Sequence, residues 1–369
     1  MSLKDILSSL LLLPALAAAV NSTVSSSGDS SSKVPRITKQ STDGDRHYVA
    51  PYFPLLGFEQ YAGNPILSPN PKHNWESAYL YNPTAIVIDD MVMMLYRAQN
   101  KTKTSSVGLA WSSNGVNFTR YDKPVLEPTE PYETPGGCED PRVVRVNGTF
   151  YMTYTGYDDT TARLCLATST DMVHWTKHGP ILPNVTDVVY DWQNPLNTYK
   201  PRAGWSKSGS ILDEPQPDGT YRMLFGDSFL YQVNSTDLVH WNYDQYVLPY
   251  ASHLNPWEMA IMESGPPAIK TRDGKWLQVY NGVATGLGGF TPSQYSTGQM
   301  LIDPVRFPHG PPVARVETPL LQPTSVDEIT GQVDHVVFTE GLVQFHGKWF
   351  MYFGQGDEFL GVATAPVQP

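Results

Sequence analysis

The sequence predicts an all-β fold, a five-bladed β-propeller with a central substrate pocket. Three observations lead to it. Hairpin signals recur five times along the chain, a short polar motif recurs between them, and 29 glycines and 32 prolines punctuate 369 residues, of which only 17% are charged. Such a composition is typical of a turn-rich β protein rather than of a helical bundle or a disordered chain.

Each hairpin signal is a short apolar strand, a tight polar turn and a second apolar strand. The five turns are separated by 55 to 73 residues and lie at Asp89–Asp90, Asn147–Gly148, Asp218–Gly219, Asp273–Gly274 and His346–Gly347. The second motif covers Ser112–Phe118, Ser169–Trp175 and Ser235–Trp241. An aromatic residue at a fixed place after an Asx turn is typical of propeller blades. Because one small sheet cannot bury both faces alone, five units predict one domain rather than two.

The first 20 residues predict a secretory signal peptide, since an apolar run from Ile6 to Val20 is too short to span a membrane comfortably and ends in small residues. Residues 21–45 then form a Ser-rich flexible leader, and residues 46–369 the single catalytic domain. Six glycosylation sequons support a secreted, extracellular glycoprotein; they begin at Asn21, Asn100, Asn117, Asn147, Asn184 and Asn234. We expect no later membrane span.

A formal net charge of −11 argues against a nucleic-acid partner. The only two cysteines, Cys138 and Cys165, either pair or remain buried free thiols. No metal-ligand spacing stands out, so we expect no metal and no cofactor. The sequence leaves the oligomeric state open.

Polar side chains gather where the five hairpins open. Those before the first strands are Asn82, Glu139, Asp140, Lys207, Glu263 and Glu340, and those after the second strands are Arg97, Asp227, Asn281 and Asp357. Strand ends are commonly polar, but this accounts poorly for so many carboxylates beside Arg97 and Lys207. Nearby aromatic residues suit stacking on sugar rings, although each one alone could equally belong to the core: Tyr79, Tyr81, Tyr96, Trp205, Trp257 and Tyr280. Paired carboxylates in an aromatic-lined pocket are what glycosidic bond cleavage needs.

Several motifs resemble those of glycoside hydrolase family 130, the mannoside phosphorylases and mannosidases. They run in order from about residue 64 to 365 and include Asn82–Ala85, Leu95–Ala98, Gly137–Arg142, Gly265–Pro267, Tyr280–Gly282 and Tyr352–Asp357. The resemblance implies a five-bladed propeller and makes Asp140 the general acid, acting through a hydroxyl of the mannose ring. It also implies that Asn82, Arg97 and Asp357 contact the sugar. Glu139 and Arg142 flank the acid, in a structural ion pair or a catalytic role.

The resemblance leaves open whether water or phosphate attacks. Lys207 stands at about the first position where phosphorylases of the family place a basic residue, but Asp227 stands where a second, an arginine, is expected. A carboxylate there repels phosphate and could activate water, with Glu263 as the other candidate base. A secreted enzyme would also lose a sugar phosphate product. We therefore expect an inverting β-mannosidase acting on oligosaccharides or glycans. The alternatives are a phosphorylase that uses inorganic phosphate as co-substrate, another five-bladed glycosidase such as an arabinanase or fructosidase, and a non-catalytic sugar-binding propeller.

Overall fold

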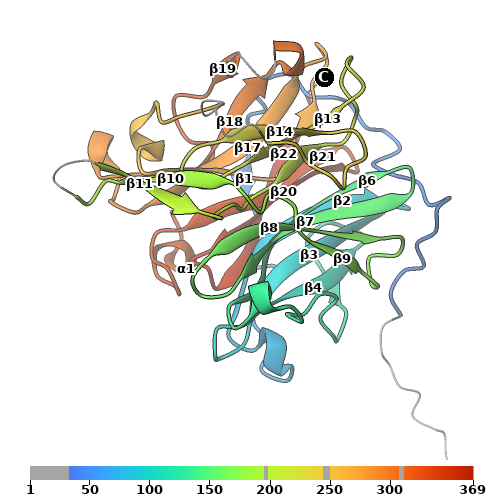
Figure 1. The fold of residues 1–369 in the computed structure, drawn as a ribbon. Helices are drawn as coiled ribbons and strands as arrows, with labels where there is room; N and C mark the ends of the chain where they lie inside the picture. The colour runs from blue at the N-terminus through green and yellow to red at the C-terminus, as the bar shows by residue number, and fades with distance from the viewer. Residues whose placement is uncertain (1–32, 195–197, 244–249, 307–310, 369) are drawn as a thin grey trace, which may run out of the picture. The chain divides into compact units, whose positions relative to one another are not determined.

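The fold is described from a computed structural model, which covers residues 33–194, 198–243, 250–306 and 311–368 (Figure 1). The expected signal peptide, most of the Ser-rich stretch and Asn21 lie outside these residues. The prediction of a mostly β fold is confirmed, because the helical segments are all short: 3₁₀ turns at Asn74–Glu76, Pro131–Glu133, Pro256–Glu258, Leu287–Gly289 and Pro304–Arg306, and helix α1 at Val326–Ile329. Among the described residues, no helix is long and apolar enough to cross a membrane.

The longest sheet consists of two antiparallel groups, joined by a single parallel pair between Ser105 and Gly137. The first group contains β2 (Tyr79–Ile88), β3 (Met91–Gln99), β4 (Ser105–Ser112) and β5 (Thr119–Arg120). The second contains β6 (Gly137–Val146), β7 (Thr149–Tyr157), β8 (Ala162–Ser169) and β9 (Thr176–Pro180).

Three further antiparallel groups and one separate hairpin follow. The third group contains β12 (Ser210–Leu212), β13 (Tyr221–Phe225) and β14 (Tyr231–Ser235). The fourth contains β15 (Ile261–Ser264), β16 (Ile269–Lys270), β17 (Trp276–Val283), β18 (Tyr295–Ile302) and β19 (Ala314–Arg315). The fifth contains β20 (Val337–Phe345), β21 (Lys348–Gln355), β22 (Phe359–Pro366) and the early strand β1 (Glu59–Gln60). The hairpin is formed by β10 (Thr186–Asp191) and β11 (Thr198–Ala203).

All five expected hairpins are confirmed: β2–β3, β6–β7, β12–β13, β16–β17 and β20–β21. We call β2, β6, β12, β15 with β16, and β20 the first strands of their groups. Five clusters of buried apolar side chains join neighbouring groups in chain order, and one of them packs the fifth group against the first. Each group therefore buries both of its faces, as the repeat argument requires.

A buried glutamate recurs beside these groups, and the sequence analysis did not identify it. The Tyr96 and Tyr154 hydroxyls donate to Glu76 and Glu133 at 2.9 and 2.8 Å, and the Tyr280 hydroxyl donates to Glu258. Each glutamate also pairs with a cation, namely Arg120, Lys177 or Arg315. These tyrosines lie in the second strand of the first, second and fourth groups, so the repeat extends from the hairpins to buried polar contacts.

The recurring Asx motif forms the expected turn in at least two groups. Asp171 Oδ1 accepts hydrogen bonds from the backbone N–H groups of Val173 and His174, and the Trp175 indole donates to Met172 O at 3.0 Å. The segment around Asp237 and Trp241 repeats these contacts. The turn therefore fixes the aromatic side chain that follows it.

Part of the segment that we assigned to the flexible leader packs against the strands. Arg145 donates to Thr38 O and Ser41 O and pairs with Asp43, and Ile37 is buried. The packed part of the chain thus begins before residue 46, because a buried arginine of β6 needs acceptors that this segment supplies. Cys138 and Cys165 are both buried and unbridged.

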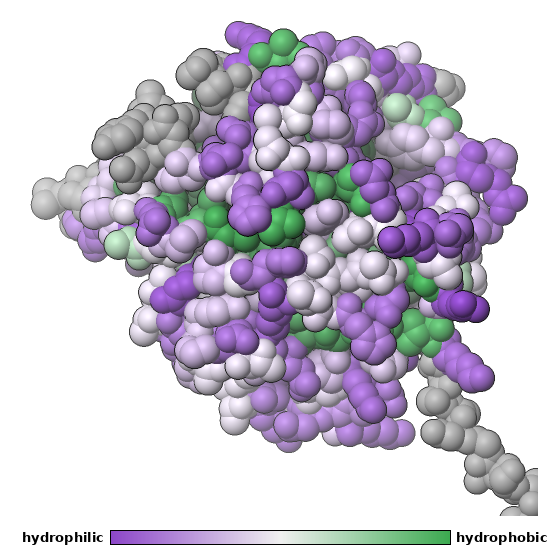
Figure 2. Space-filling view, turned by 45° about the vertical axis from the view of Figure 1, so that its right-hand side comes forward, coloured by the Kyte–Doolittle hydropathy of each residue, from purple (hydrophilic) through white to green (hydrophobic). Residues whose placement is uncertain are grey.

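The face shown in Figure 2 is mostly hydrophilic, with apolar side chains exposed in groups between polar ones. Among the expected sequons, Asn117, Asn147 and Asn184 are exposed, whereas Asn100 and Asn234 are half-buried.

Candidate active site

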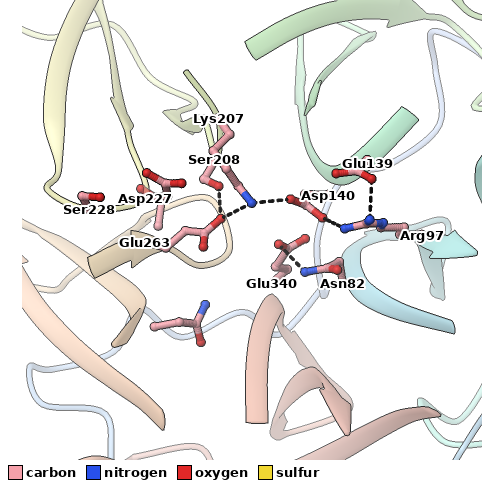
Figure 3. Close-up of polar contacts among 12 residues, drawn as sticks. Asn82, Arg97, Glu139, Asp140, Lys207, Ser208, Asp227, Ser228, Glu263 and Glu340 are labelled. Carbon is pink, nitrogen blue, oxygen red and sulfur yellow. Dashed lines mark hydrogen bonds and ion pairs between the residues drawn. The ribbon is translucent and has the colours of Figure 1, made fainter. Parts of the chain in front are cut away.

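The first strands carry the expected polar residues in β-bulges. The pairing register shifts between Tyr81 and Thr84 in β2, between Glu139 and Arg142 in β6, and between Thr339 and Gly341 in β20. Bulges re-aim side chains, and these three present Asn82, Asp140 and Glu340. Asn82 and Asp140 have φ of 50° and 48°, and a proline follows each, which suits a place where the ladder is interrupted. Figure 3 shows the three side chains around one centre.

Asp140 lies between two cations. Its Oδ1 accepts a hydrogen bond from Arg97 Nη1 at 2.9 Å, and its Oδ2 is 2.9 Å from Lys207 Nζ. Burial alone would raise the pKa of Asp140, but the charges of Lys207 and Arg97 outweigh it and hold the pKa well below its ordinary value. Asp140 is therefore a carboxylate in the unliganded site.

Arg97 also pairs with Glu139 and lies over the Tyr81 ring, 4.4 Å from its centre. Burial raises the pKa of Glu139 to about 7, although Arg97 acts in the opposite direction. Glu139 and Asp140 thus hold Arg97 through different nitrogens, Nη2 and Nη1 (Figure 3).

Lys207 joins Asp140 to the fourth group. Its Nζ is 3.1 Å from Glu263 Oε1, an oxygen that also accepts a hydrogen bond from the Ser208 hydroxyl. Glu263 is only 4% exposed, and burial raises its pKa against the charge of Lys207. The Lys207 ammonium group therefore lies between two carboxyl groups whose pKa values are shifted in opposite directions: the pKa of Asp140 is lowered and that of Glu263 is raised.

Asp227, which we expected to repel phosphate and considered as a base that activates water, is paired with a cation. Arg202 of β11 pairs with both of its oxygens, and the Trp205 indole donates to Oδ2 at 3.1 Å. Burial would raise the pKa of Asp227, but Arg202 lowers it. Arg202 also pairs with Asp187, whose pKa burial and Asp227 raise to about 7. The cation that the sequence analysis missed here comes from the separate hairpin, which has no counterpart in the repeat.

Arg142 and Asn281 hold the groups together. Arg142 donates to Gly265 O at 2.9 Å and Asp140 O at 3.1 Å and pairs with Glu340 at 2.9 Å. Asn281 Nδ2 donates a hydrogen bond to Thr339 O, and Asn281 Oδ1 accepts hydrogen bonds from Thr339 N and from the Thr297 hydroxyl. These contacts join strands, so the structure favours the structural role for Arg142 and places Asn281 as a tie between β17, β18 and β20.

Glu340 lies beneath the centre of the site. Its Oε1 accepts from Asn82 Nδ2 at 2.9 Å, and its buried Oε2 has no hydrogen-bond partner among the described residues. Burial raises the pKa of Glu340 to about 8, against Arg142 and with the help of the Asp140 and Glu263 charges. Burial likewise raises the pKa of Asp357 to about 6.

A pocket of about 90 Å³ opens at the centre. Six expected residues line it, namely Asn82, Arg97, Asp140, Lys207, Glu263 and Asp357. Tyr295, Val336 and Phe338 complete the lining, and the sequence analysis missed them because they precede or begin strands without a polar signal. Five other expected residues do not line the pocket: Glu139, Arg142, Asp227, Asn281 and Glu340.

The aromatic residues divide between the core and the site. Trp257, Tyr96 and Tyr280 are fully buried, so they belong to the core. Tyr81 supports Arg97, and Trp205 supports Asp227 and Arg202, whose guanidinium lies 4.3 Å from the centre of the indole. Their rings therefore position charged groups.

Comparison with known proteins identifies related sequences and structures. A family described as β-1,4-mannooligosaccharide phosphorylase matches residues 58–369. A 1,2-β-oligomannan phosphorylase of Thermoanaerobacter sp. strain X514 is 30% identical over 330 residues, covering 85% of this chain and 99% of that protein.

Solved structures extend the comparison. A glycosyl hydrolase from Bacteroides ovatus is 31% identical, with a TM-score of 0.73 over 87% of this chain and 99% of that one. A second structure is from the GH130 family of mannoside phosphorylases, which is described as containing glycoside hydrolases that target β-1,2-mannosidic linkages in Candida mannan. It is 31% identical, with a TM-score of 0.72 over 89% of this chain and 99% of that one.

Proposed function

The chain belongs to glycoside hydrolase family 130, and from that premise we propose that it hydrolyses β-mannosidic bonds of oligosaccharides with inversion at the anomeric carbon. The family contains β-mannoside phosphorylases and β-1,2-mannoside hydrolases, so this is an enzyme that acts on β-mannosides. Water as the nucleophile is the part that we propose.

The observation that carries the proposal is the pairing of the cations. Arg97, Lys207 and Arg202 all pair with carboxylates of lowered pKa, Asp140 or Asp227. The buried Arg142 donates to Gly265 O and Asp140 O and contacts Glu340. Phosphate would have to displace a carboxylate from one of them and then lie among the remaining acidic groups. Like charges within a buried site repel strongly, so this arrangement favours a neutral nucleophile. The sequence also predicted water as the nucleophile, because Asp227 replaces an expected arginine. In the structure a cation, Arg202, is present at this place, and Asp227 neutralises it.

We assign the acid to Asp140 and the base to Glu263. Both line the pocket, whereas both oxygens of Asp227 are held by Arg202. A base with a raised pKa is well matched to catalysis near neutral pH. Asp140 needs a proton to act as the acid, and displacement of Lys207 by the bound sugar would remove the strongest charge that opposes protonation.

The reaction then balances in one displacement. Glu263 takes a proton from water as the water oxygen bonds to the anomeric carbon from the face opposite the leaving group. The glycosidic bond breaks, and the proton of Asp140 reaches the leaving oxygen through a hydroxyl of the sugar. Inverting enzymes usually place the two carboxyl groups about 6.5–9.5 Å apart to admit the water. Here Lys207 Nζ lies 2.9 Å from Asp140 Oδ2 and 3.1 Å from Glu263 Oε1, so these two oxygens are closer together than that range, and the water can enter only when Lys207 is displaced.

The same proposal includes the fold and the location. The cyclic packing of five groups supports a five-bladed propeller, with the first strands around the pocket and with the packed segment from Ile37 to Asp43 as part of the catalytic domain. Asn117, Asn147 and Asn184 are exposed and therefore accessible to glycosylation, and we propose secretion from the N-terminal sequence alone.

The deciding experiment incubates the protein with β-1,2- and β-1,4-mannobiose, each with and without inorganic phosphate. We expect mannose in both conditions, released first as the α-anomer in NMR spectra. Mannose 1-phosphate formed only with phosphate would show a phosphorylase instead. Binding without any turnover would support a sugar-binding protein, and turnover of arabinan or fructan substrates alone would overturn the substrate class.

A further inference from the structure

The hairpin β10–β11 is an addition to the five groups. Its two strands form a sheet of their own, in which Thr186 lies opposite Ala203 and Asp191 opposite Thr198. In Figure 1 the hairpin projects at the side of the other sheets. Such a hairpin is marginally stable alone, so contacts at its base must hold it.

Those contacts tie the hairpin to the candidate active site. Arg202 of β11 pairs with Asp187 of β10 and with Asp227, and its guanidinium lies over the Trp205 ring. Asp227 lies between β13 and β14 of the third group and close to Lys207 and Glu263 (Figure 3), so the base of the hairpin has a fixed place next to the reaction centre. Arg202 therefore anchors the hairpin as well as neutralising Asp227, and Asp187 is its second partner at this anchor.

Four aromatic rings form a cluster beside this base. Tyr190 and Tyr199 face each other across the hairpin at 5.1 Å, and Tyr199 lies 5.8 Å from Phe229. Phe229 stacks on His253 at 4.7 Å with an 18° angle, and His253 is also 5.8 Å from Tyr190. The outer ring, Tyr199, is 56% exposed, whereas Phe229 is 8% exposed.

One ring of this cluster, Phe229, lies two residues after Asp227 in the sequence. Gly226 makes the turn here possible, since its φ of 115° and a Cβ that would lie 2.1 Å from Phe229 O exclude other residues from the turn. Asp227 and Phe229 thus belong to one tight turn, and Tyr199 continues the aromatic surface away from it.

The pocket itself is too small for a whole oligosaccharide. Its volume of about 90 Å³ is well below the roughly 300–1,000 Å³ of sites that enclose ligands. Most of a substrate with several sugars must therefore lie outside the pocket, on the surface beside it.

We propose that Tyr199, supported by Tyr190 and Phe229, forms a stacking platform for sugar units of the substrate that lie beyond the cleaved bond. Tyrosine rings offer an apolar face at low conformational cost, which matches the C–H face of a pyranose ring. The platform makes longer oligosaccharides better substrates than the disaccharide. This inference rests on the proposed function, because it names the substrate length that the same site prefers.

The test compares a β-mannotetraose with a β-mannobiose of the linkage that the enzyme cleaves. Tyr199→Ala should raise the ratio of KM(tetraose) to KM(biose) about tenfold, the loss typical of removing one well-packed tyrosine. Tyr199→Phe keeps the ring and should shift the ratio by no more than about twofold. Tyr61→Ala removes an exposed tyrosine near β1 and serves as the matched control, with the ratio unchanged. An unchanged ratio in Tyr199→Ala would overturn the platform even if hydrolysis is confirmed.

A second measurement separates this inference from the proposed function. If the wild-type protein turns over neither sugar, the proposed function fails, and calorimetry with β-1,2-mannotetraose then compares wild type with Tyr199→Ala. Weaker binding by the variant would still support the platform, and equal binding would overturn it.

Discussion

The two ends of the same first strands differ sharply. At the site end, three strands bulge and direct Asn82, Asp140 and Glu340 to a small pocket lined mainly by charged and polar side chains. At the far end, the register is regular, as in the Ala85–Met94 and Val87–Val92 pairs. There the strands line a cavity of about 360 Å³ with mostly aliphatic side chains, beside residues 43–48 of the N-terminal segment.

The difference separates function from stability along single strands. Left-handed backbone at non-glycine residues costs about 1–3 kcal/mol each, and it occurs at both ends: at Asn82, Asp140, Ser208 and Asp357 of the site, and at Asp89, Asp90, Asn147 and His346 in the hairpin turns. What distinguishes the site end is its buried charge, which the regular pairing and apolar packing of the far end must offset. Changes at the site end should alter catalysis, and changes at the far end should alter stability.

Asp140→Asn should give the largest effect. We expect kcat to fall about 10³-fold, because a general acid contributes 10²–10⁴ and the amide has no proton to give. The measurement is steady-state hydrolysis of the cleaved mannobiose.

Asp213→Asn is the matched control, since Asp213 borders the far-end cavity. Its kcat should stay within about twofold of wild type. Equal losses in both variants, or normal turnover by Asp140→Asn, would end the assignment of the acid.

Glu263→Ala should lower kcat about 10²-fold, and sodium azide should restore turnover by forming α-mannosyl azide. The alanine leaves room for the anion, which needs no base. Asp227→Ala should lose activity without azide rescue, because its side chain holds Arg202 and Trp205 rather than the water. Rescue of Asp227→Ala alone would move the base to Asp227.

Sequence alone predicted the hairpins and six of the residues that line the pocket, because turn residues and strand ends are local signals. It could not place Arg202, since an ion pair between a separate hairpin and Asp227 depends on tertiary packing. Nor could it separate Trp257 and Tyr280, which are buried, from rings available to a sugar. The bulges at Asn82 and Asp140 had a readable signal in the prolines that follow them, although only the structure shows that they share one centre.

Leu342→Ala should affect the far end alone. Leu342 is 7% exposed and lines the far-end cavity, so its truncation should lower the free energy of unfolding by about 2 kcal/mol, the lower part of the usual range, because the added void merges with an existing one. Urea unfolding measures the loss, and kcat should not change. A lower kcat with unchanged stability would contradict the division between the two ends.

Glu340→Gln should have the smallest effect, visible only as a change in pH dependence. Burial raises the pKa of Glu340 from an ordinary 4.5 to about 8, so between these values the folded protein keeps a proton that the unfolded chain has lost. The unfolded chain then binds fewer protons, and the free energy of unfolding falls as pH rises through this window. Glutamine has no proton to lose and its Oε1 can still accept from Asn82, so Tm should fall less from pH 5 to pH 8 in the variant. Glu214→Gln, an exposed change beyond β12, is the control and should keep the wild-type slope. An unchanged or steeper slope in Glu340→Gln would mean that Arg142 holds Glu340 as a carboxylate, and the site end would then carry one more negative charge against phosphate.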